Sequence, residues 1–346
     1  MGSSKTSFQS TLGDSVVAKG RCTNCCACVV ACPYNCLGPV EQKPSLLKEC
    51  PQCGICEKTC PQYDWSLSDE ERFTFGKARK PEETFGVYRR LVVSRATDGA
   101  VLRVGQDGGV ATALLLHALK NVLIDRAVVS GIDPNKPLFP VPKVAISFED
   151  VLACAGTRYF YSPNLLALAE AMKGKIGIGF VGTPCQIKAI RKMQLAGLKK
   201  YDSLKFLIGL MCSECYDYDG LMKRHLHQEL GLDPKDILKI NIKGKMNITM
   251  RNGQIKSLRL AEVKQHARKS CESCSDFSSE LADISVGGLG LNGWTFTIIR
   301  SEKGEEVFSN AERARFVQTR NASEEMHALN LLIKLSEKKR RLQRSQ

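Results

Sequence analysis

The sequence lacks any apolar run that approaches the roughly 18 residues needed to cross a membrane, so we predict no transmembrane helix. Its first ten residues, MGSSKTSFQS, are polar and do not contain the apolar core of a secretory signal. We therefore expect a cytoplasmic protein, in a compartment where thiols stay reduced.

The sequence also lacks the motifs of several common enzyme and binding classes. The segment VGQDGGVATALLLHAL (104–119) has neither a Rossmann G-x-G-x-x-G nor the lysine of a Walker phosphate loop. Zinc-finger C2H2 and RNA-binding patterns are missing, so we expect no nucleic-acid partner. Only five histidines are present, in helical or charged surroundings, which disfavours a cysteine–histidine nucleophile.

Cysteine, in contrast, is abundant, with 16 residues in 346. Two runs read C-x2-C-x2-C-x3-C and are followed by Pro33 and Pro61. This is the spacing of bacterial ferredoxins with two [4Fe–4S] clusters, in which the fourth cysteine of each run binds the other cluster. Zinc fingers use separated C-x2-C pairs, which makes zinc the weaker interpretation. We predict one cluster on Cys22, Cys25, Cys28 and Cys60, and a second on Cys50, Cys53, Cys56 and Cys32.

Cys26 and Cys36 lie outside this pattern, and we interpret them as buried structural thiols. Five further cysteines are scattered over the C-terminal half: Cys185, Cys212, Cys215, Cys271 and Cys274. In GFVGTPCQ a strand, a tight turn and a helix start precede Cys185, which suits either a nucleophile or a cluster ligand. We favour the ligand, although unrelated buried thiols would also fit the spacing.

Basic residues outnumber acidic ones by 50 to 36, which gives a formal charge of +14. Three thiolate-bound [4Fe–4S] clusters would contribute about −6 and leave about +8. The remaining excess fits a polyanionic cofactor, an acidic partner subunit or nucleic acid.

The hydrophobic pattern predicts an α+β fold: an N-terminal bacterial-type dicluster ferredoxin domain followed by a mixed α/β domain. We expect strands at 88–96, 126–132, 204–212, 282–288 and 293–308. Helices are expected at 108–123 and 217–230, a strand–turn–helix at 175–193, a β-meander at 237–260 and an amphipathic helix at 322–344. Two glycines, Gly108 and Gly109, precede the 108–123 helix and could let a phosphate approach its N-terminus.

Several segments of the chain resemble those of a known family. They include QDGGVATALL (106–115), AGTRYFYSP (155–163), GTPCQI (182–187), GLMC (209–212) and CESCSDFSSELADISVGGLG (271–290). Together with GWTFTIIR (293–300), they resemble the coenzyme F420 hydrogenase/dehydrogenase beta-subunit family. With the N-terminal cysteine runs attached, the chain is similar to the subunit that oxidises reduced F420 for a membrane-bound dehydrogenase. The domains implied are 1–64 (ferredoxin-like), 65–85 (linker), 86–321 (family domain) and 322–346 (basic helix).

The resemblance implies FAD and a third [4Fe–4S] cluster in the family domain. The implied cluster ligands are Cys185, Cys212, Cys271 and Cys274, with the choice between Cys212 and Cys215 left open, and Cys154 is structural. Arg158 is the natural partner of the FAD pyrophosphate. The implied FAD contacts are Asp107, Gly108, Gly109, Thr112, Thr157, Arg158, Tyr159, Ser162, Gly182 and Thr183.

The function implied is hydride transfer between coenzyme F420 and FAD, with single electrons passed through the clusters to the other subunits of a redox complex. Lys264, Arg268 and Lys269 are candidates for a basic mouth that receives F420. The alternatives are a substrate-free electron-transfer subunit, or a family relative acting on a tetrapyrrole or in sulfite- or formate-linked chemistry. The basic tail KKRRLQR (338–344) is expected to be a solvated helix end, or to dock on a partner or on the cytoplasmic face of the membrane.

Overall fold

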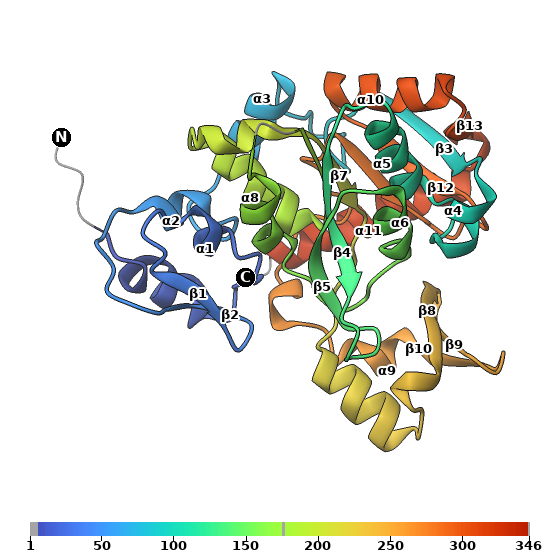
Figure 1. Cartoon of the computed structure of the whole chain (residues 1–346), viewed down its shortest axis with the longest axis horizontal. Coiled ribbons are helices and arrows are strands. Elements are labelled where there is room, and N and C mark those ends of the chain that lie inside the picture. The colour runs from blue at the N-terminus through green and yellow to red at the C-terminus, as the bar shows by residue number, and fades with distance from the viewer. Residues whose placement is uncertain (1–5, 175–176, 345–346) are drawn as a thin grey trace.

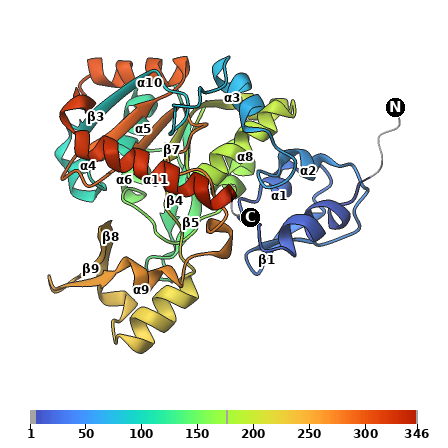
Figure 2. The ribbon, with the colours of Figure 1, turned by 180° about the vertical axis from the view of Figure 1, so that it is seen from behind.

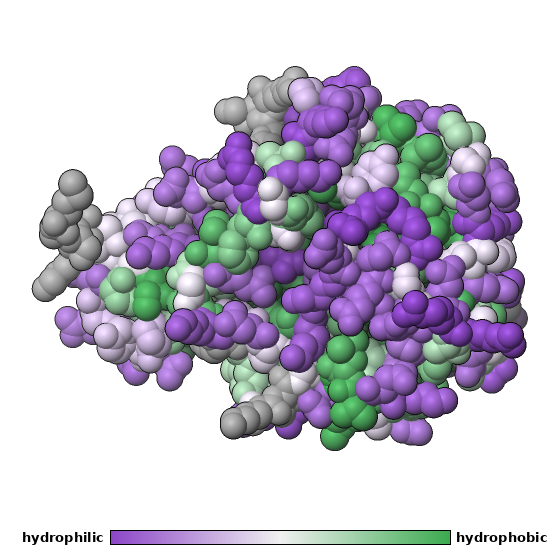
Figure 3. All heavy atoms as spheres, turned by 90° about the horizontal axis from the view of Figure 1, so that it is seen from above, coloured by the Kyte–Doolittle hydropathy of each residue, from purple (hydrophilic) through white to green (hydrophobic). Residues whose placement is uncertain are grey.

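The computed structural model describes residues 6–174 and 177–344. An N-terminal lobe, drawn in blue in Figure 1, lies beside a large sheet covered by helices, and a smaller lobe containing β8–β10 lies on the other side of the sheet's lower end. None of the described helices is long and apolar enough to span a membrane. The face seen in Figure 3 is mostly hydrophilic, with apolar residues in separate small areas.

The N-terminal lobe has short elements, because its chain must return repeatedly to its cysteines. Phe8, Leu12 and Val16 form a small apolar core with the cysteine loops. Each of the two short α-helices ends at an extended cysteine, Cys32 or Cys60, and proline follows both. The elements are a π-helix Gln9–Val17, α1 Ala27–Ala31, β1 Leu37–Val40, β2 Lys43–Leu46 and α2 Ile55–Thr59.

The segment predicted as a linker is packed and contains α3 (Leu67–Phe75). The Ser66 hydroxyl accepts a hydrogen bond from the Asp69 amide at 3.4 Å and caps this helix. Beyond α3, Arg79 pairs with buried Glu71 and, at 2.6 Å, with buried Glu280 of the main domain. Residues 66–79 are thus anchored to the main domain, and the domain boundaries stay a prediction.

The main sheet has eight strands in the order β13-β3-β12-β11-β7-β6-β4-β5. The four central strands β4, β6, β7 and β11 are parallel and the outer pairings are antiparallel, which confirms the predicted mixed α/β character. Their bounds are β3 Arg90–Ala96, β4 Arg126–Ile132, β5 Pro140–Ala145, β6 Ile178–Gly182, β7 Leu204–Leu210, β11 Ile284–Gly287, β12 Thr295–Ile299 and β13 Val317–Asn321.

Helices cover both faces of this sheet. Val92 of β3 packs in a core with α5 and α10, whereas its neighbour Val93 packs with α11 on the opposite face, as expected when side chains alternate along a strand. Figure 2 shows α11 lying along this second face. The helices are α4 Gly99–Val104, α5 Val110–Lys120, α6 Phe148–Ala153, α7 Leu168–Ala171, α8 Pro184–Leu195, α10 Glu302–Arg313 and α11 Met326–Arg344.

The smaller lobe confirms the predicted meander. Three antiparallel strands follow a π-helix (Asp219–Glu229) and precede a short helix. They are β8 Ile237–Lys243, β9 Lys245–Met250, β10 Ile255–Arg259 and α9 Leu260–Lys264. Single turns of 3-10 helix occupy Asn164–Ala167, Lys199–Ser203, Pro234–Asp236, Lys269–Cys271 and Ala322–Glu324.

One secondary-structure prediction is wrong. The segment 302–308, predicted as part of a strand, begins α10. The Ser301 hydroxyl caps this helix by accepting from the Gly304 amide at 3.0 Å, and acidic residues occupy its first turn. Val307, Phe308 and Ala311 then form a buried helical stripe. The first two residues of the predicted 175–193 unit lie outside the described residues, and the rest forms β6 and α8.

Candidate functional site

The structure brings Cys22, Cys25, Cys28 and Cys60 together, and we call them the first set. Burial raises the pKa of the Cys25 and Cys28 thiols well above its usual value, and the nearby charge of Cys60 raises it further. The extended C-cap of α2 directs Cys60 away from its own run toward these thiols. This is the crossed arrangement expected from the spacing, and the role of these cysteines as ligands stays a prediction.

The second set is Cys50, Cys53, Cys56 and Cys32. Burial raises the pKa of Cys56 to about 12, and Cys50 and Cys53 lie close enough to add to the effect. Cys36 connects Cys32 with this group, because its amide donates to the Cys32 sulfur at 3.3 Å and its thiol is near both Cys32 and Cys50. Cys36 itself is buried and donates to the Glu49 carbonyl at 3.2 Å, as a structural thiol would.

All five scattered cysteines converge in a third set: Cys185, Cys212, Cys215, Cys271 and Cys274. Their meeting point follows from the sheet topology. Cys185 follows β6 and Cys212 follows β7, and these parallel neighbours end at the same edge, where α/β proteins place their ligands. Cys271 and Cys274 reach the same edge from the turn after α9.

Within the third set, Cys212 has the central place. It lies close enough to Cys185, Cys271 and Cys274 to raise the pKa of each beyond the effect of burial, whereas the Cys215 thiol lies beside Cys212. Cys215 contributes a backbone amide instead, which donates to the Cys271 sulfur at 3.5 Å. The Thr183 hydroxyl lies 3.2 Å from the Cys185 sulfur.

Burial dominates the pKa of the thiols in these sets. Burial raises the pKa of Cys60 and Cys185 to about 11 and that of Cys271 to about 12, so the free thiols resist ionisation. A bound iron–sulfur core would stabilise the thiolates, because metal ligation requires deprotonated cysteine. Buried thiols crowded at this spacing therefore match the needs of such clusters.

The described residues form no site for a single metal ion. Among residues 6–174 and 177–344, no three or more histidine, cysteine or acidic side chains are arranged to hold one metal ion.

Cationic side chains lie around the three cysteine sets. The spacing of the cysteines in the sequence does not predict them. Lys192 of α8 donates to the carbonyls of Cys60, Tyr63 and Asp64 at 2.6–2.9 Å and so fixes the end of the second run. Lys339 of α11 donates to the Cys271 carbonyl at 3.3 Å. Burial disfavours its charge, but Cys274, Cys212 and Cys271 together raise its pKa above the usual value.

The first and third sets adjoin each other. Cys185 lies close enough to Cys25 to raise its pKa, and burial raises the pKa of Tyr161, with Cys185 and Cys25 raising it further. The Arg268 guanidinium lies 4.2 Å from the centre of the Tyr161 ring and donates to the Thr23 carbonyl, beside Cys22, at 2.9 Å. Arg268 was a candidate for an open basic mouth. It is instead a half-buried link between the lobes, while Lys264 and Lys269 are exposed.

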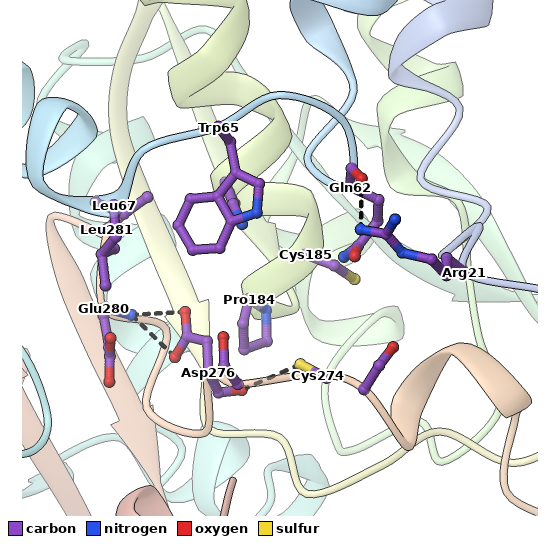
Figure 4. Close-up of a pocket in the computed structure, with 13 residues that line it drawn as sticks. Arg21, Gln62, Trp65, Leu67, Pro184, Cys185, Cys274, Asp276, Glu280 and Leu281 are labelled. Atoms are coloured by element: carbon purple, nitrogen blue, oxygen red, sulfur yellow. Dashed lines mark hydrogen bonds between the residues drawn. The ribbon is translucent and has the colours of Figure 1, made fainter. Parts of the chain in front are cut away.

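A cavity of about 390 Å³ opens between the N-terminal lobe and the third set. Figure 4 shows Cys185 and Cys274 at its wall, with Trp65 across from them and Arg21 donating to the Gln62 carbonyl. Lys188, one turn after Cys185 on α8, lies over the Trp65 ring, and burial lowers its pKa to about 7. The cavity provides space beside two thiols of the third set.

A second candidate site surrounds the glycine turn, residues 105–109. Among the described residues, no side chain caps the first amides of the α5 helix that follows, so these amides are available to a ligand. The Arg158 Nε is buried with no hydrogen-bond partner in the described structure, and Lys239 donates to the Gly105 carbonyl at 3.5 Å. Lys243 pairs with Asp107 at 3.3 Å. A partly buried guanidinium whose Nε is unpaired in the described structure, two lysines and a helix N-terminus fit a phosphate-bearing cofactor.

The glycines of this turn are also required by packing, and their predicted role in ligand approach stays a prediction. A Cβ on Gly108 would lie 2.6 Å from the Ser94 carbonyl oxygen, and one on Gly109 would lie 2.8 Å from the Val101 side chain. Gly109 also has a φ of 66°, which favours glycine. Packing against β3 and α4 therefore requires these glycines, whatever ligand the helix start binds.

The ten residues implied as FAD contacts fall into two groups. The group at the glycine turn includes Tyr159, whose hydroxyl accepts from the Ile242 amide at 3.0 Å. Burial raises the pKa of Tyr159 to about 12, and nearby Asp107 adds to this shift. Thr157 is exposed there, and Thr112 is buried on α5. The other group adjoins Cys185. Its members are Ser162, Gly182 and Thr183, joined through Gln186, which donates to the Ser162 carbonyl and accepts from the Thr183 amide.

Two further cysteines are accounted for by the fold. Cys26 is buried and donates to the Asn24 side-chain oxygen at 3.4 Å. Cys154 ends α6, and burial raises its pKa. Cys26 lies near Cys22 and Cys28 of the first set, but the hydrogen bond of its thiol to Asn24 is that of a structural thiol, which stays our interpretation for both residues.

Comparison with known proteins identifies the class. Two family models match, described as the N-terminal part (residues 91–169) and the C-terminal part (residues 176–325) of the coenzyme F420 hydrogenase/dehydrogenase beta subunit. They cover more than half of the chain, which therefore belongs to this family, as its motifs predicted.

Individual relatives agree with this assignment. The chain is 37% identical to the coenzyme F420 hydrogenase subunit beta of Methanococcus voltae, over 74% of this chain and 92% of that protein. It is 29% identical to one subunit of the F(420)H(2) dehydrogenase of Methanosarcina mazei, over 85% of this chain and 83% of the relative. A chain of the F420-reducing [NiFe] hydrogenase complex from Methanosarcina barkeri superposes with a TM-score of 0.72 at 32% identity, covering 77% of this chain and 94% of that chain. These relatives are subunits of F420-linked redox proteins.

Proposed function

We propose that this chain is an F420-dependent oxidoreductase subunit that exchanges hydride with coenzyme F420 through bound FAD and passes single electrons to a partner complex. The observation that carries the proposal is the adjacency of the third and first cysteine sets, through Cys185 and Cys25. It gives a continuous line of candidate cluster sites from the family domain into the N-terminal lobe.

FAD would supply the conversion between a two-electron hydride and single electrons, and [4Fe–4S] clusters would carry those electrons. Arg158, Lys239, Lys243 and the first amides of α5 would neutralise the pyrophosphate. Ser162, Gly182 and Thr183 would lie along the cofactor on the side of Cys185. Passing the two electrons of the hydride to one-electron carriers would release its proton, which solvent would accept, so the chain's contribution is to bind, orient and insulate.

The proposed cluster ligands are Cys22, Cys25, Cys28 and Cys60; Cys50, Cys53, Cys56 and Cys32; and Cys185, Cys212, Cys271 and Cys274. We assign Cys212 rather than Cys215 to the third cluster, because Cys212 is the common neighbour of the other three. Lys192 would hold the second run in place through its three carbonyl contacts.

The test is anaerobic purification of the full chain, followed by iron, flavin and turnover measurements. The proposal requires about 12 iron atoms in three [4Fe–4S] clusters, one FAD, and oxidation of reduced F420 with a one-electron dye as acceptor. Protein that holds iron but no flavin and ignores F420 would support the substrate-free electron carrier. Colourless, zinc-loaded protein would contradict every part of the proposal.

A further inference from the structure

The C-terminal end of α11 lies at the third cysteine set. Figure 2 shows α11 following the back of the main sheet until it reaches the junction with the N-terminal lobe. There the Lys339 ammonium donates to the Cys271 carbonyl at 3.3 Å, and the residue is only 7% exposed. The family models end at residue 325, before α11 begins at Met326. The matched family region therefore does not include this contact.

Lys339 occupies a position that helical periodicity would assign to an apolar residue. Ala328, Leu332 and Ser336 are buried at intervals of four, and Lys339 follows three residues later on the same face. Lys338 points outward and is exposed. Arg340 holds this end of the helix by pairing with buried Glu280 at 2.9 Å. A buried lysine is costly unless an anionic group compensates its charge.

We propose that Lys339 sets the reduction potential of the third iron–sulfur site by holding a positive charge beside it. The inference rests on the proposed function, since it needs a cluster on the third set. A thiolate-bound [4Fe–4S] cluster carries about −2 when oxidised and gains one more negative charge on reduction. A nearby cation in a buried site stabilises the reduced form more than the oxidised form and so raises the potential.

Two other cations near the third set are committed to different contacts. Arg268 is fixed between the Tyr161 ring and the Thr23 carbonyl, where it joins the lobes. Lys188 lies over the Trp65 ring on the cavity side. Lys339 alone among these three donates directly to the backbone of a proposed ligand.

The test uses the full-length protein, purified without oxygen, in four variants: Lys339→Met, Lys339→Gln, Lys339→Arg and the control Lys338→Met. The midpoint potential of the third site is measured by redox titration with electron paramagnetic resonance (EPR) detection. Its signal is assigned by its loss in Cys185→Ser. The two neutral variants should shift the oxidised-to-reduced equilibrium about tenfold, to a potential lower by about 59 mV for a one-electron couple. Lys339→Arg and Lys338→Met should remain within about twofold of the wild type, which is about 18 mV.

Any other result contradicts the inference, and each one identifies a different explanation. An equal shift in Lys338→Met would point to general surface charge, and an equal shift in Lys339→Arg would point to packing. Loss of the third-site iron in Lys339→Gln would assign the lysine to assembly. A wild type with only two clusters would contradict the proposed function itself, whereas a third cluster of unchanged potential in Lys339→Met contradicts only the inference.

Discussion

At the scale of the residue, Cys212 and Cys215 provide the sharpest test of the third site. Both are in the third set, but Cys212 is the neighbour of the other three cysteines, and Cys215 offers its amide to the Cys271 sulfur. We expect Cys212→Ser to lower the iron content from about 12 to about 8 atoms per chain, and Cys215→Ser to leave it unchanged. Iron analysis of anaerobically purified variants measures this. The reverse result would exchange the two assignments.

Arg158 is the residue on which FAD binding should depend most. Among the described residues its buried Nε has no hydrogen-bond partner, and charge-assisted hydrogen bonds contribute about 1.5–3 kcal/mol, or about 10- to 160-fold in affinity. Arg158→Met should weaken FAD binding by this factor, as measured by fluorescence titration of deflavinated protein. Arg103→Met, an equal charge change at an exposed position on α4, should have no effect. Equal flavin affinity in the two variants would place the pyrophosphate elsewhere.

The cysteines of the first two sets could be predicted from the sequence because their spacing is local. A run of eleven residues forms one loop, so the chain itself brings the thiols together. Lys239, Lys243 and Lys339 could not be predicted, because each reaches its site from a segment distant in sequence. The tail was expected to be solvated, and only the packing of α11 reveals that Lys339 faces inward.

At the scale of the element, α3 and α10 show where pattern analysis fails. The segment EKGEEVF has apolar and charged residues that suit either a strand or a helix, and the Ser301 cap decides in favour of α10. The charged composition of residues 65–85 resembles a linker, but Glu70 and Glu71 are buried. Glu71 is buried because Arg79 pairs with it within the fold, which the charge pattern alone did not predict.

Glu70 of α3 makes a testable contribution to stability. It is 1% exposed, neither carboxylate oxygen has a hydrogen-bond partner in the described structure, and burial raises its pKa to about 7. This pKa lies above the ordinary value near 4.5, which means that the folded protein favours the protonated Glu70 side chain. Ionisation of Glu70 therefore destabilises the fold. The free energy of unfolding should therefore fall as pH rises from about 4.5 to about 7, by roughly 2–3 kcal/mol.

The Glu70→Gln variant should remove this dependence. Its thermal midpoint should exceed that of the wild type at pH 8 and approach it only near pH 4.5, since the neutral amide carries no ionisation cost. Asp69→Asn, which changes an exposed neighbour on the same helix, serves as the control. A wild-type pH profile retained in Glu70→Gln would show that the Glu70 carboxylate is compensated in solution.

At the scale of the whole molecule, Arg268 joins the two parts between which electrons would pass. Its bond to the Thr23 carbonyl fixes the loop of the first set against the main domain. Arg268→Met should increase amide hydrogen exchange in residues 21–28 about tenfold or more, since a hydrogen bond to a charged group contributes about 1.5–3 kcal/mol. Lys264→Met, at an exposed position on α9, should leave the exchange unchanged. Equal exchange in both variants would mean that other contacts hold the lobes together.

The central claim is that electrons from F420 reach the N-terminal lobe only through the third cysteine set. The most direct measurement mixes reduced F420 with the anaerobic full-length protein and follows flavin absorbance and the EPR signals of the first two clusters. In the wild type both should be reduced. In Cys185→Ser the flavin should be reduced while the two clusters remain oxidised on the same timescale. Reduction of those clusters at the wild-type rate in Cys185→Ser would contradict the account.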